Sequence, residues 1–508
     1  MSEDEKSANV DGSVPARLIK NTLSQIGLAV AVIAFANIVF LFLVDLISTT
    51  PNPYIGVLTY MVMPGFLLFG LLMVVVGALL ERRRRFKGQT DTPRLPRIDL
   101  NNPKQRNSVA FLLSFLVIFA LLSAVGSFKA YKATESVSFC GQSCHALYPE
   151  FTAYSVSPHA KVACVDCHVG PGASWYVRSK LSGLTELYAT LRNTYPRPIP
   201  SPVKNLRPAQ DTCEECHWPS KFWGAQSKTF THFGSDEQNT PRAITLLIKV
   251  GGGDPALGVA GGGIHWHMNI ANKIEYYASD EKRQIIPWVR ITDSQGKITE
   301  YTVKDNPPTP DQIAKADKRR MDCVDCHNRP THIYVPPDLS VDRAMAINAI
   351  DPSLPFIKQQ GVEVLTAKYK TSEEAQKAIP EKINAFYQTK YPEIASSKTQ
   401  AVKAAANELQ RIFSKTFFPD MKVNWQTHPN NIGHFYSAGC FRCHDGNHVS
   451  ASGQVISKDC NSCHTLAAQQ EGKEELAAIP NQSFKHPIDL GDLTAVNCSD
   501  CHTGGSAP

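Results

Sequence analysis

The sequence predicts a mainly α-helical protein with much coil, in which three transmembrane helices precede a large domain packed around prosthetic groups. Three apolar runs, about 26–47, 55–80 and 108–128, lie near the N-terminus. All 14 cysteines follow the third run in seven close pairs. Strand patterns are short, as at 243–250. A chain of 508 residues exceeds one ordinary domain, so we expect several regions.

The apolar runs and the basic segment between them predict a membrane topology for region 25–128. Each run has about 20 or more residues, enough to cross a bilayer as a helix, and none shows the polar face of a soluble core helix. Residues 81–107 carry nine Lys and Arg against three acids. Cytoplasmic loops are rich in Lys and Arg, so this loop and the polar tail 1–24 are expected in the cytoplasm. Residues after 128 are then expected in the periplasm of a bacterial inner membrane.

Six of the seven cysteine pairs read C-x-x-C-H, which is the attachment signature of c-type haem. The two thiols bond one edge of the porphyrin, and the next side chain reaches the iron as an axial ligand. Zinc sites and disulfides also use paired cysteines, but neither selects a His directly after the second Cys. The predicted attachment residues are Cys140, Cys144, Cys164, Cys167, Cys213, Cys216, Cys323, Cys326, Cys440, Cys443, Cys460, Cys463, Cys498 and Cys501. The predicted proximal iron ligands are His145, His168, His217, His327, His444, His464 and His502.

The first pair, in "SVSFCGQSCHALYPEF" (136–151), departs from this spacing. Three residues separate Cys140 from Cys144, and His145 follows. Because His again follows the second Cys, we interpret it as a seventh haem site. It is the first motif after the last apolar run, so its haem is expected nearest to the membrane.

Nine histidines remain for the opposite side of the irons. Low-potential haems that carry electrons commonly take a second strong ligand, and neutral imidazole serves well. His265 and His267 in "IHWH" would share one face of a strand, so one or both are expected to bind iron. His428 is less favoured. The candidate distal ligands are His159, His232, His265, His267, His332, His434, His448 and His486.

The periplasmic part is expected to have three regions. Residues 129–335 hold the first four motifs and form a tetrahaem domain. Residues 336–425 lack Cys and read as a helical, haem-free spacer or partner-docking element. Residues 426–508 hold three closely spaced motifs. The Gly-rich stretch 251–263 lacks the strand and helix of a dinucleotide site and is expected to be a loop.

The flanks of the motifs resemble a known family. Cys140–His145, "EFTAYSVSPHAKVACVDCHVGPG" and "CEECHWPSKFWG" are similar to the NapC/NirT family of membrane-anchored multihaem quinol dehydrogenases, over about 108–335. Three spans, seven haems and "GCFRCHDGNHVSASG" resemble more closely the seven-haem inner-membrane cytochromes of metal-respiring bacteria. The resemblance implies menaquinol oxidation beside the first haem, with electrons passed to periplasmic multihaem cytochromes in anaerobic respiration.

The resemblance also implies quinol-site residues in "SWYVRSKLSGLTELYATLRN". The matching positions are Lys180 and Glu186. The apolar residues there follow helical spacing, and such a helix could lie on a membrane surface. In the family, a Met often follows the first motif His by two residues, but here that position is Leu147. The first haem is therefore expected to have His145 on one side and an open or weakly occupied site on the other.

Two other functions stay open from the sequence. A terminal reductase of a small oxyanion would need a dedicated catalytic haem, often with an altered proximal ligand, and all seven motifs end in His. An electron bridge fed by another membrane subunit could use the two additional spans for docking. With 52 basic and 46 acidic residues, the charge requires no nucleic-acid partner. Whether the chain forms oligomers is left open.

Overall fold

The structure is a computed structural model that divides into two compact units, Met1–Ser143 and Cys144–Pro508. The description that follows covers residues 21–47, 62–86, 99–143, 145–170, 173–203, 206–252, 262–268, 272–472, 474–476, 484–486, 488–493 and 496–505.

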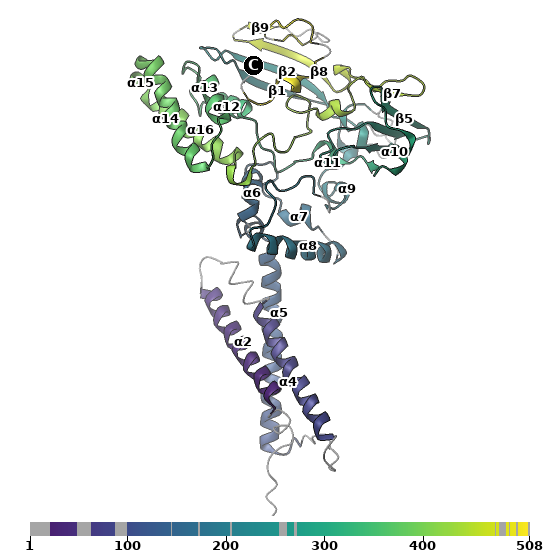
Figure 1. The fold of residues 1–508 in the computed structure, drawn as a ribbon, viewed down its shortest axis with the longest axis vertical. Coiled ribbons are helices and arrows are strands. Elements are labelled where there is room, and N and C mark those ends of the chain that lie inside the picture. The colour runs from purple at the N-terminus through teal and green to yellow at the C-terminus, as the bar shows by residue number, and fades with distance from the viewer. Residues whose placement is uncertain are drawn as a thin grey trace, which may run out of the picture. The chain divides into compact units, whose positions relative to one another are not determined.

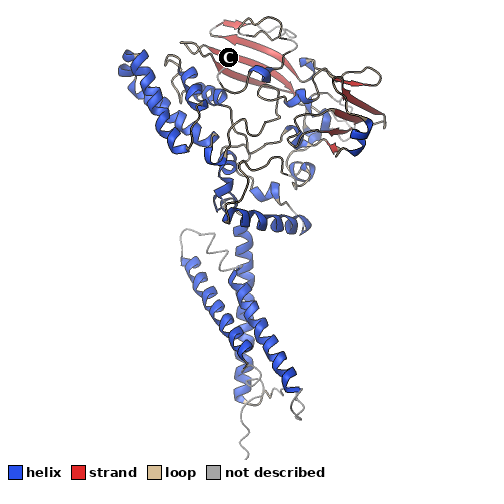
Figure 2. Ribbon diagram, in the orientation of Figure 1, coloured by secondary structure: helices blue, strands red, loops and turns tan. Residues whose placement is uncertain are grey.

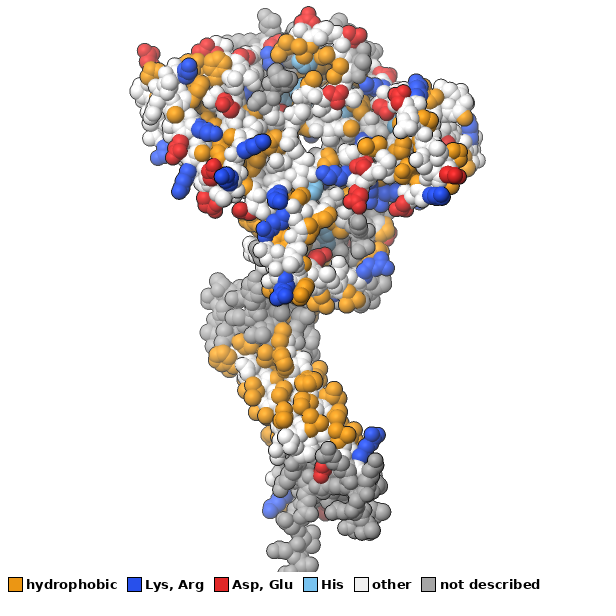
Figure 3. Space-filling view, in the orientation of Figure 1, with side chains coloured by type: hydrophobic (Ala, Val, Ile, Leu, Met, Phe, Trp, Pro, Cys, Tyr) orange, Lys and Arg blue, Asp and Glu red, His pale blue; other side chains and the backbone are white. Residues whose placement is uncertain are grey.

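The described part of the first unit is built from long helices (Figure 1). Two are long and apolar enough to cross a membrane, over Thr22–Leu43 and Met63–Glu81, in a search limited to the described residues. Apolar side chains cover much of their described surface (Figure 3), which suits a lipid environment. The elements are α2 (Thr22–Ile47), α4 (Met63–Phe86), α5 (Pro103–Thr134) and the π-helical turn η2 (Phe139–Ser143).

Helices α2 and α4 pack through small residues. A Cβ atom at Gly27 would lie 2.6 Å from the carbonyl oxygen of Gly70, so the two backbones approach closely only because both positions are glycine. The Ser24 hydroxyl donates a hydrogen bond to the Val74 carbonyl at 3.1 Å. Small residues and interhelical hydrogen bonds are the usual means of packing helices in lipid.

The predicted spans agree in part with these helices. The first matches α2, and the third lies inside α5, which extends beyond it at both ends. The second, 55–80, overlaps α4 from Met63 onward, and its residues 55–61 lie outside the described part. The basic loop was predicted as 81–107, but α4 continues to Phe86 and α5 begins at Pro103, so both ends of that range are helical. The Arg and Glu residues after the apolar run favour helix, which explains the longer α4.

The second unit combines helices with two antiparallel sheets (Figure 2). Its α-helices of five or more residues are α6 (Tyr148–Ser155), α7 (Cys164–His168), α8 (Ala173–Leu191), α9 (Ala209–Cys213), α10 (Pro310–Lys315), α12 (Pro337–Ala346), α13 (Ile357–Thr366), α14 (Ser372–Lys390), α15 (Pro392–Ser397) and α16 (Thr399–Thr416). Its strands are β1 (Ala225–Phe233), β2 (Pro241–Lys249), β3 (Lys273–Tyr277), β4 (Trp288–Thr292), β5 (Ile298–Val303), β6 (Arg319–Arg320), β7 (His448–Ser450), β8 (His464–Glu471) and β9 (Glu474–Leu476).

The two sheets join the predicted tetrahaem and trihaem regions. One has the order β1-β2-β8-β9 and the other β6-β3-β4-β5-β7. Strands β7, β8 and β9 come from the C-terminal region and pair with strands formed before residue 336. The predicted boundaries therefore do not separate independent folding units. The strand pattern at 243–250 is confirmed in β2, while the extent of the sheets exceeds what the sequence predicted.

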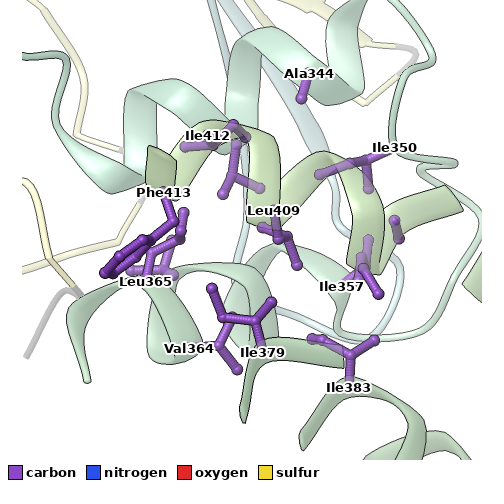
Figure 4. Packing of buried hydrophobic residues seen from close by; sticks show 14 of the residues in the cluster. Ala344, Ile350, Ile357, Val364, Leu365, Ile379, Ile383, Leu409, Ile412 and Phe413 are labelled. Carbon is purple, nitrogen blue, oxygen red and sulfur yellow. The ribbon is translucent and has the colours of Figure 1, made fainter. Parts of the chain in front are cut away.

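The predicted spacer holds the largest apolar core among the described residues. Helices α12 to α16 enclose it, with Ile379 and Ile383 of α14 facing Leu409 and Phe413 of α16 (Figure 4). This core explains how a stretch without haem motifs can have a stable fold, because it buries ordinary aliphatic side chains. It is fastened to β1 through a hydrogen bond from the Phe233 amide to the Asp342 carboxylate at 3.0 Å.

Candidate haem sites

Each regular motif includes part of a short helical turn, and in several motifs the amide of the His donates to the carbonyl of the first Cys. The His217 amide donates to the Cys213 carbonyl at 2.8 Å, and the same bond joins His327 to Cys323. The remaining short turns at motifs are α11 (Cys323–Cys326), η8 (Gly439–Arg442), η9 (Cys460–Ser462) and α17 (Cys498–Cys501). The 11 described cysteines from Cys167 to Cys501 are free, so none of these 11 forms a disulfide.

An Asp directly before the second Cys stabilises three of these turns. In each case its carboxylate accepts a hydrogen bond from the amide of the residue before the first Cys, as Asp325 does from Asp322 at 2.7 Å. Asp166 and Asp500 make the same contact. This capping role was not predicted, although the repeated C-x-D-C-H spelling was the available signal.

The irregular motif starts in a wider turn. Cys140 lies in η2, a π-helical turn in which the backbone accommodates an additional residue per hydrogen-bonded ring. This gives a physical account of the longer spacing between Cys140 and Cys144. Cys144 itself and the side chain of His145 lie outside the described part of the chain.

The structure places six motif histidines opposite six of the histidines that lie outside the motifs. Metal–imidazole bonds are about 2 Å long, so two imidazoles on opposite sides of one metal have ring centroids roughly 6 Å apart. All six separations fit this value. The pairs are His168 with His332 (6.4 Å), His217 with His159 (5.9 Å), His327 with His265 (6.3 Å), His444 with His267 (5.8 Å), His464 with His434 (6.1 Å) and His502 with His486 (6.2 Å).

Backbone carbonyls orient several of these rings for metal binding. The Nδ1 atom of His265 contacts the Val250 carbonyl at 2.7 Å, and that of His332 contacts the Glu150 carbonyl at 3.0 Å. A proton held on Nδ1 leaves the Nε2 lone pair free to bind a metal. His267, His444 and His486 have the same kind of contact.

Burial keeps most of these imidazoles neutral, which is the state that binds metal. It lowers the pKa of His168 and His332, which face each other, with a nearby second imidazole adding to the effect at His168. It also lowers the pKa of His267, to which the charge of His444 contributes. Burial therefore favours the neutral imidazole, which can bind a metal, over the protonated imidazolium.

Three spare histidines do not face a motif His in this structure. His448 is buried, with Nδ1 at 2.9 Å from Asp445 Oδ1 and Nε2 at 2.7 Å from the Ile286 carbonyl. Burial opposes its charge, but these hydrogen bonds outweigh burial and raise its pKa. Both nitrogens are thus occupied, which argues against the predicted ligand role. His232 instead contacts Asp342 at 3.0 Å.

His428, which was not favoured as a ligand, is buried at 7% exposure. Its Nδ1 has no hydrogen-bond partner, as is also true of Nδ1 in His159 and His434. Burial, with help from the charge of Arg329, lowers its pKa to about 4. His428 is therefore a buried neutral imidazole outside the six pairs.

Successive motifs lie next to one another in chain order. The Cys213 thiol lies beside that of Cys323, although 110 residues separate them in sequence. Arg442, inside the fifth motif, donates to the Asp325 carbonyl inside the fourth at 2.7 Å. The thiols that lie close enough to interact electrostatically are Cys167 with Cys213, Cys213 with Cys323, Cys326 with Cys440, Cys440 with Cys463 and Cys460 with Cys498.

Helix α8 carries the predicted quinol residues. Its predicted apolar stripe is exposed at Leu181, Leu184 and Tyr188. Lys180 is half-buried, and Glu186 is exposed and accepts a hydrogen bond from the Ser182 hydroxyl at 3.4 Å. Since α8 is a continuous α-helix, the two residues stand about 9 Å apart along its axis and on different faces.

Paired histidines beside cysteine turns, together with apolar N-terminal helices, define a membrane-type multihaem cytochrome c. The comparisons with known proteins agree. Residues 102–198 match the N-terminal region of the NapC/NirT cytochrome c family, and residues 434–507 match cytochrome c3. The chain belongs to the NapC/NirT cytochrome c family. It is 45% identical over 498 residues to cytochrome c-type protein ImcH of Geobacter sulfurreducens, which covers 96% of this chain and 97% of that protein. No solved structure matches.

Membership of these cytochrome families implies covalently bound haem c, and the described residues fit that group. The 11 cysteines from Cys167 to Cys501 are free, the imidazoles are paired at the required separation, and two paired rings keep a buried Nδ1 without a partner. Among the described residues, no three His, Cys, Asp or Glu side chains converge in a group that could hold a bare metal ion. The structure therefore gives no support to the zinc alternative.

Proposed function

We propose that this protein oxidises menaquinol at the inner membrane and passes the electrons through seven covalently bound haems to periplasmic electron carriers. The six histidine pairs carry this proposal, because two strong nitrogen ligands on each iron suit electron transfer rather than substrate binding. A terminal reductase would need an iron with one open side, and none of these six irons would have one.

In this proposal the motif histidines hold one side of each iron and the six facing histidines hold the other. The contacts between successive motifs support a single path that runs from the second haem to the seventh in chain order. The links at Arg442 and in the shared sheets support a rigid path, since they fasten the last three motifs to the earlier ones.

The first haem is proposed as the electron acceptor from quinol. A quinol releases two electrons and two protons, and haem accepts one electron at a time and no protons, so protein groups must receive the protons. Lys180 and Glu186 are proposed to bind the quinol and take part in this transfer. The exposed apolar stripe of α8 supports a position at the surface of the membrane, where menaquinol dissolves.

His145 is proposed as the ligand on one side of the first iron, with an open or weakly occupied site on the other. The π-helical start of this motif and the Leu at position 147 set it apart from the other six. A high-spin signal for one haem in seven is expected. A low-spin signal for this haem would contradict the proposal, and His428 would then be the ligand to test.

The multi-pass topology, with the haems in the periplasm, is proposed from the two candidate spans, the apolar part of α5 and the basic residues between α4 and α5. A positive loop on the cytoplasmic side would place the helix that leads to Cys140 with its C-terminal end outside. This is the side on which haem is attached to c-type cytochromes.

The function is tested by stopped-flow reduction of the haems in purified protein in lipid. The protein is mixed without oxygen with a reduced menaquinone analogue. Wild type is expected to be reduced rapidly, and Lys180→Ala at least tenfold more slowly, because a charged group at the quinol would be lost. Arg192→Ala, an exposed residue just after α8, is the control and should react like wild type.

Full reduction by dithionite with none by quinol, in wild type, would contradict quinol oxidation. It would favour an electron bridge that receives electrons from another protein.

A further inference from the structure

Arg207 is a buried guanidinium with two unsatisfied nitrogens. Its residue is 8% exposed, and its Nε and Nη1 atoms have no hydrogen-bond partner. Its Nη2 atom donates to the Asp211 carbonyl at 3.2 Å. No carboxylate of the described residues forms an ion pair with it, and the neighbouring segments 171–172 and 204–205, which lie outside the described part, contain no Asp or Glu.

The other buried arginine among the described residues has its partners. Arg329, at 5% exposure, donates to Glu150 Oε2 at 3.0 Å and to the His332 carbonyl. A guanidinium keeps its charge in proteins, so burying one without an anion is costly. Arg207 therefore calls for an anion that the polypeptide does not supply.

The position of Arg207 identifies where that anion would come from. Asp211, its one backbone partner, lies two residues before Cys213 of the third motif. On its other side lies Gly170, two residues after His168 of the second motif. A Cβ atom at Gly170 would lie 2.6 Å from the Cδ atom of Arg207, so this glycine leaves room for the side chain. The guanidinium is thus enclosed between two adjacent motifs.

Each haem carries two propionate carboxylates, and planar guanidinium groups bind carboxylates through two parallel hydrogen bonds. We propose that Arg207 is the counter-ion of a haem propionate, from the haem of either the second or the third motif. The inference rests on the proposed haem content of the chain. A fixed positive charge near a haem favours the added electron, so Arg207 raises the reduction potential of that haem.

The experiment is a spectroelectrochemical titration of the full-length, haem-loaded protein at several pH values. In Arg207→Gln, the titration step of one haem is expected to shift to lower potential; each such step is called a component here. Its potential should also become more pH-dependent near neutrality, because an unpaired buried carboxylate takes up a proton when the haem is reduced. Arg207→Lys keeps the charge and should restore most of the wild-type potential. Arg320→Gln removes an exposed arginine near the fourth motif and should shift nothing, because water screens its charge.

Two further variants identify the haem. Exchange of a distal His for Met raises the potential of its haem. If the component lowered by Arg207→Gln is the one raised by His332→Met, the propionate belongs to the second haem. If it is the one raised by His159→Met, the propionate belongs to the third haem.

If every component of Arg207→Gln keeps its wild-type potential, the inference is overturned. Loss of haem from both the Gln and the Lys variants would also overturn it. Haem content of the wild type is measured beside them. Fewer than seven haems there would count against the proposed function instead, so the two failures are distinguishable.

Discussion

At the scale of single residues, the spare histidines divide into six that face a motif histidine and three that do not. Sequence proximity to a motif favoured His448 in "CHDGNH", yet its two nitrogens are fastened to Asp445 and to a backbone carbonyl. His265 and His267 lie in one short turn, but they face two different motif histidines. Spacing in sequence could not distinguish these cases, because the partners come from distant segments.

Substitution of His448 should therefore affect folding and not haem ligation. His448→Leu leaves the Asp445 carboxylate without its partner and the buried Ile286 carbonyl unpaired, at a cost of about 2 kcal/mol. We expect a lower midpoint in urea unfolding and an unchanged haem spectrum. Loss of one low-spin haem in this variant would restore His448 as a ligand.

His428 should make stability depend on pH. Its pKa is about 4 when folded and 6.5 when unfolded, so between these values the unfolded chain binds more protons. The contribution of about 3 kcal/mol is complete above pH 6.5 and is lost as the pH falls toward 4.

Unfolding of wild type and His428→Asn is compared at pH 4.5 and pH 7. The free energy of unfolding of wild type, relative to that of His428→Asn, should be lower at pH 4.5 than at pH 7. A difference independent of pH would contradict the burial of a neutral His428.

At the scale of elements, patterns that depend on local sequence were predicted well and pairings between distant segments were not. The exposed stripe of α8, strand β2 and the helical spacer were predicted from periodicity and composition. The joining of β8 to β2 was not, because strand partners more than 200 residues apart leave no periodic signal in either strand.

The α2–α4 pair offers a matched test of packing. A Cβ atom at Gly70 would lie 2.6 Å from the Gly27 carbonyl and 2.7 Å from the Ala31 amide nitrogen, whereas one at Gly65 meets nothing within 4 Å. Gly70→Val should force the helices apart, and Gly65→Val on the same helix should not.

Resistance of the two variants to unfolding in SDS provides the measurement. Gly70→Val is expected to unfold at a clearly lower SDS fraction than wild type. Equal resistance of both variants would show that the close approach of the two glycines contributes nothing.

At the scale of the whole molecule, the candidate haem sites of the second unit combine residues from distant segments. The attachment cysteines and proximal histidines could be predicted from sequence, because c-type attachment needs a fixed local spacing. The six facing pairs could not, since each facing histidine comes from another segment, as His434 does opposite His464 and His159 opposite His217. The buried Arg207 had no sequence signal at all, because its partner is expected on a haem.

The pairing of histidines is tested most directly by near-infrared magnetic circular dichroism, combined with a haem count, on the purified protein. The technique distinguishes bis-histidine ligation from histidine–methionine and high-spin haem. We predict seven haems per chain, six of them low-spin with two histidine ligands and one with a different spectrum. Fewer than six bis-histidine haems in a fully loaded protein would contradict the pairs seen in the structure.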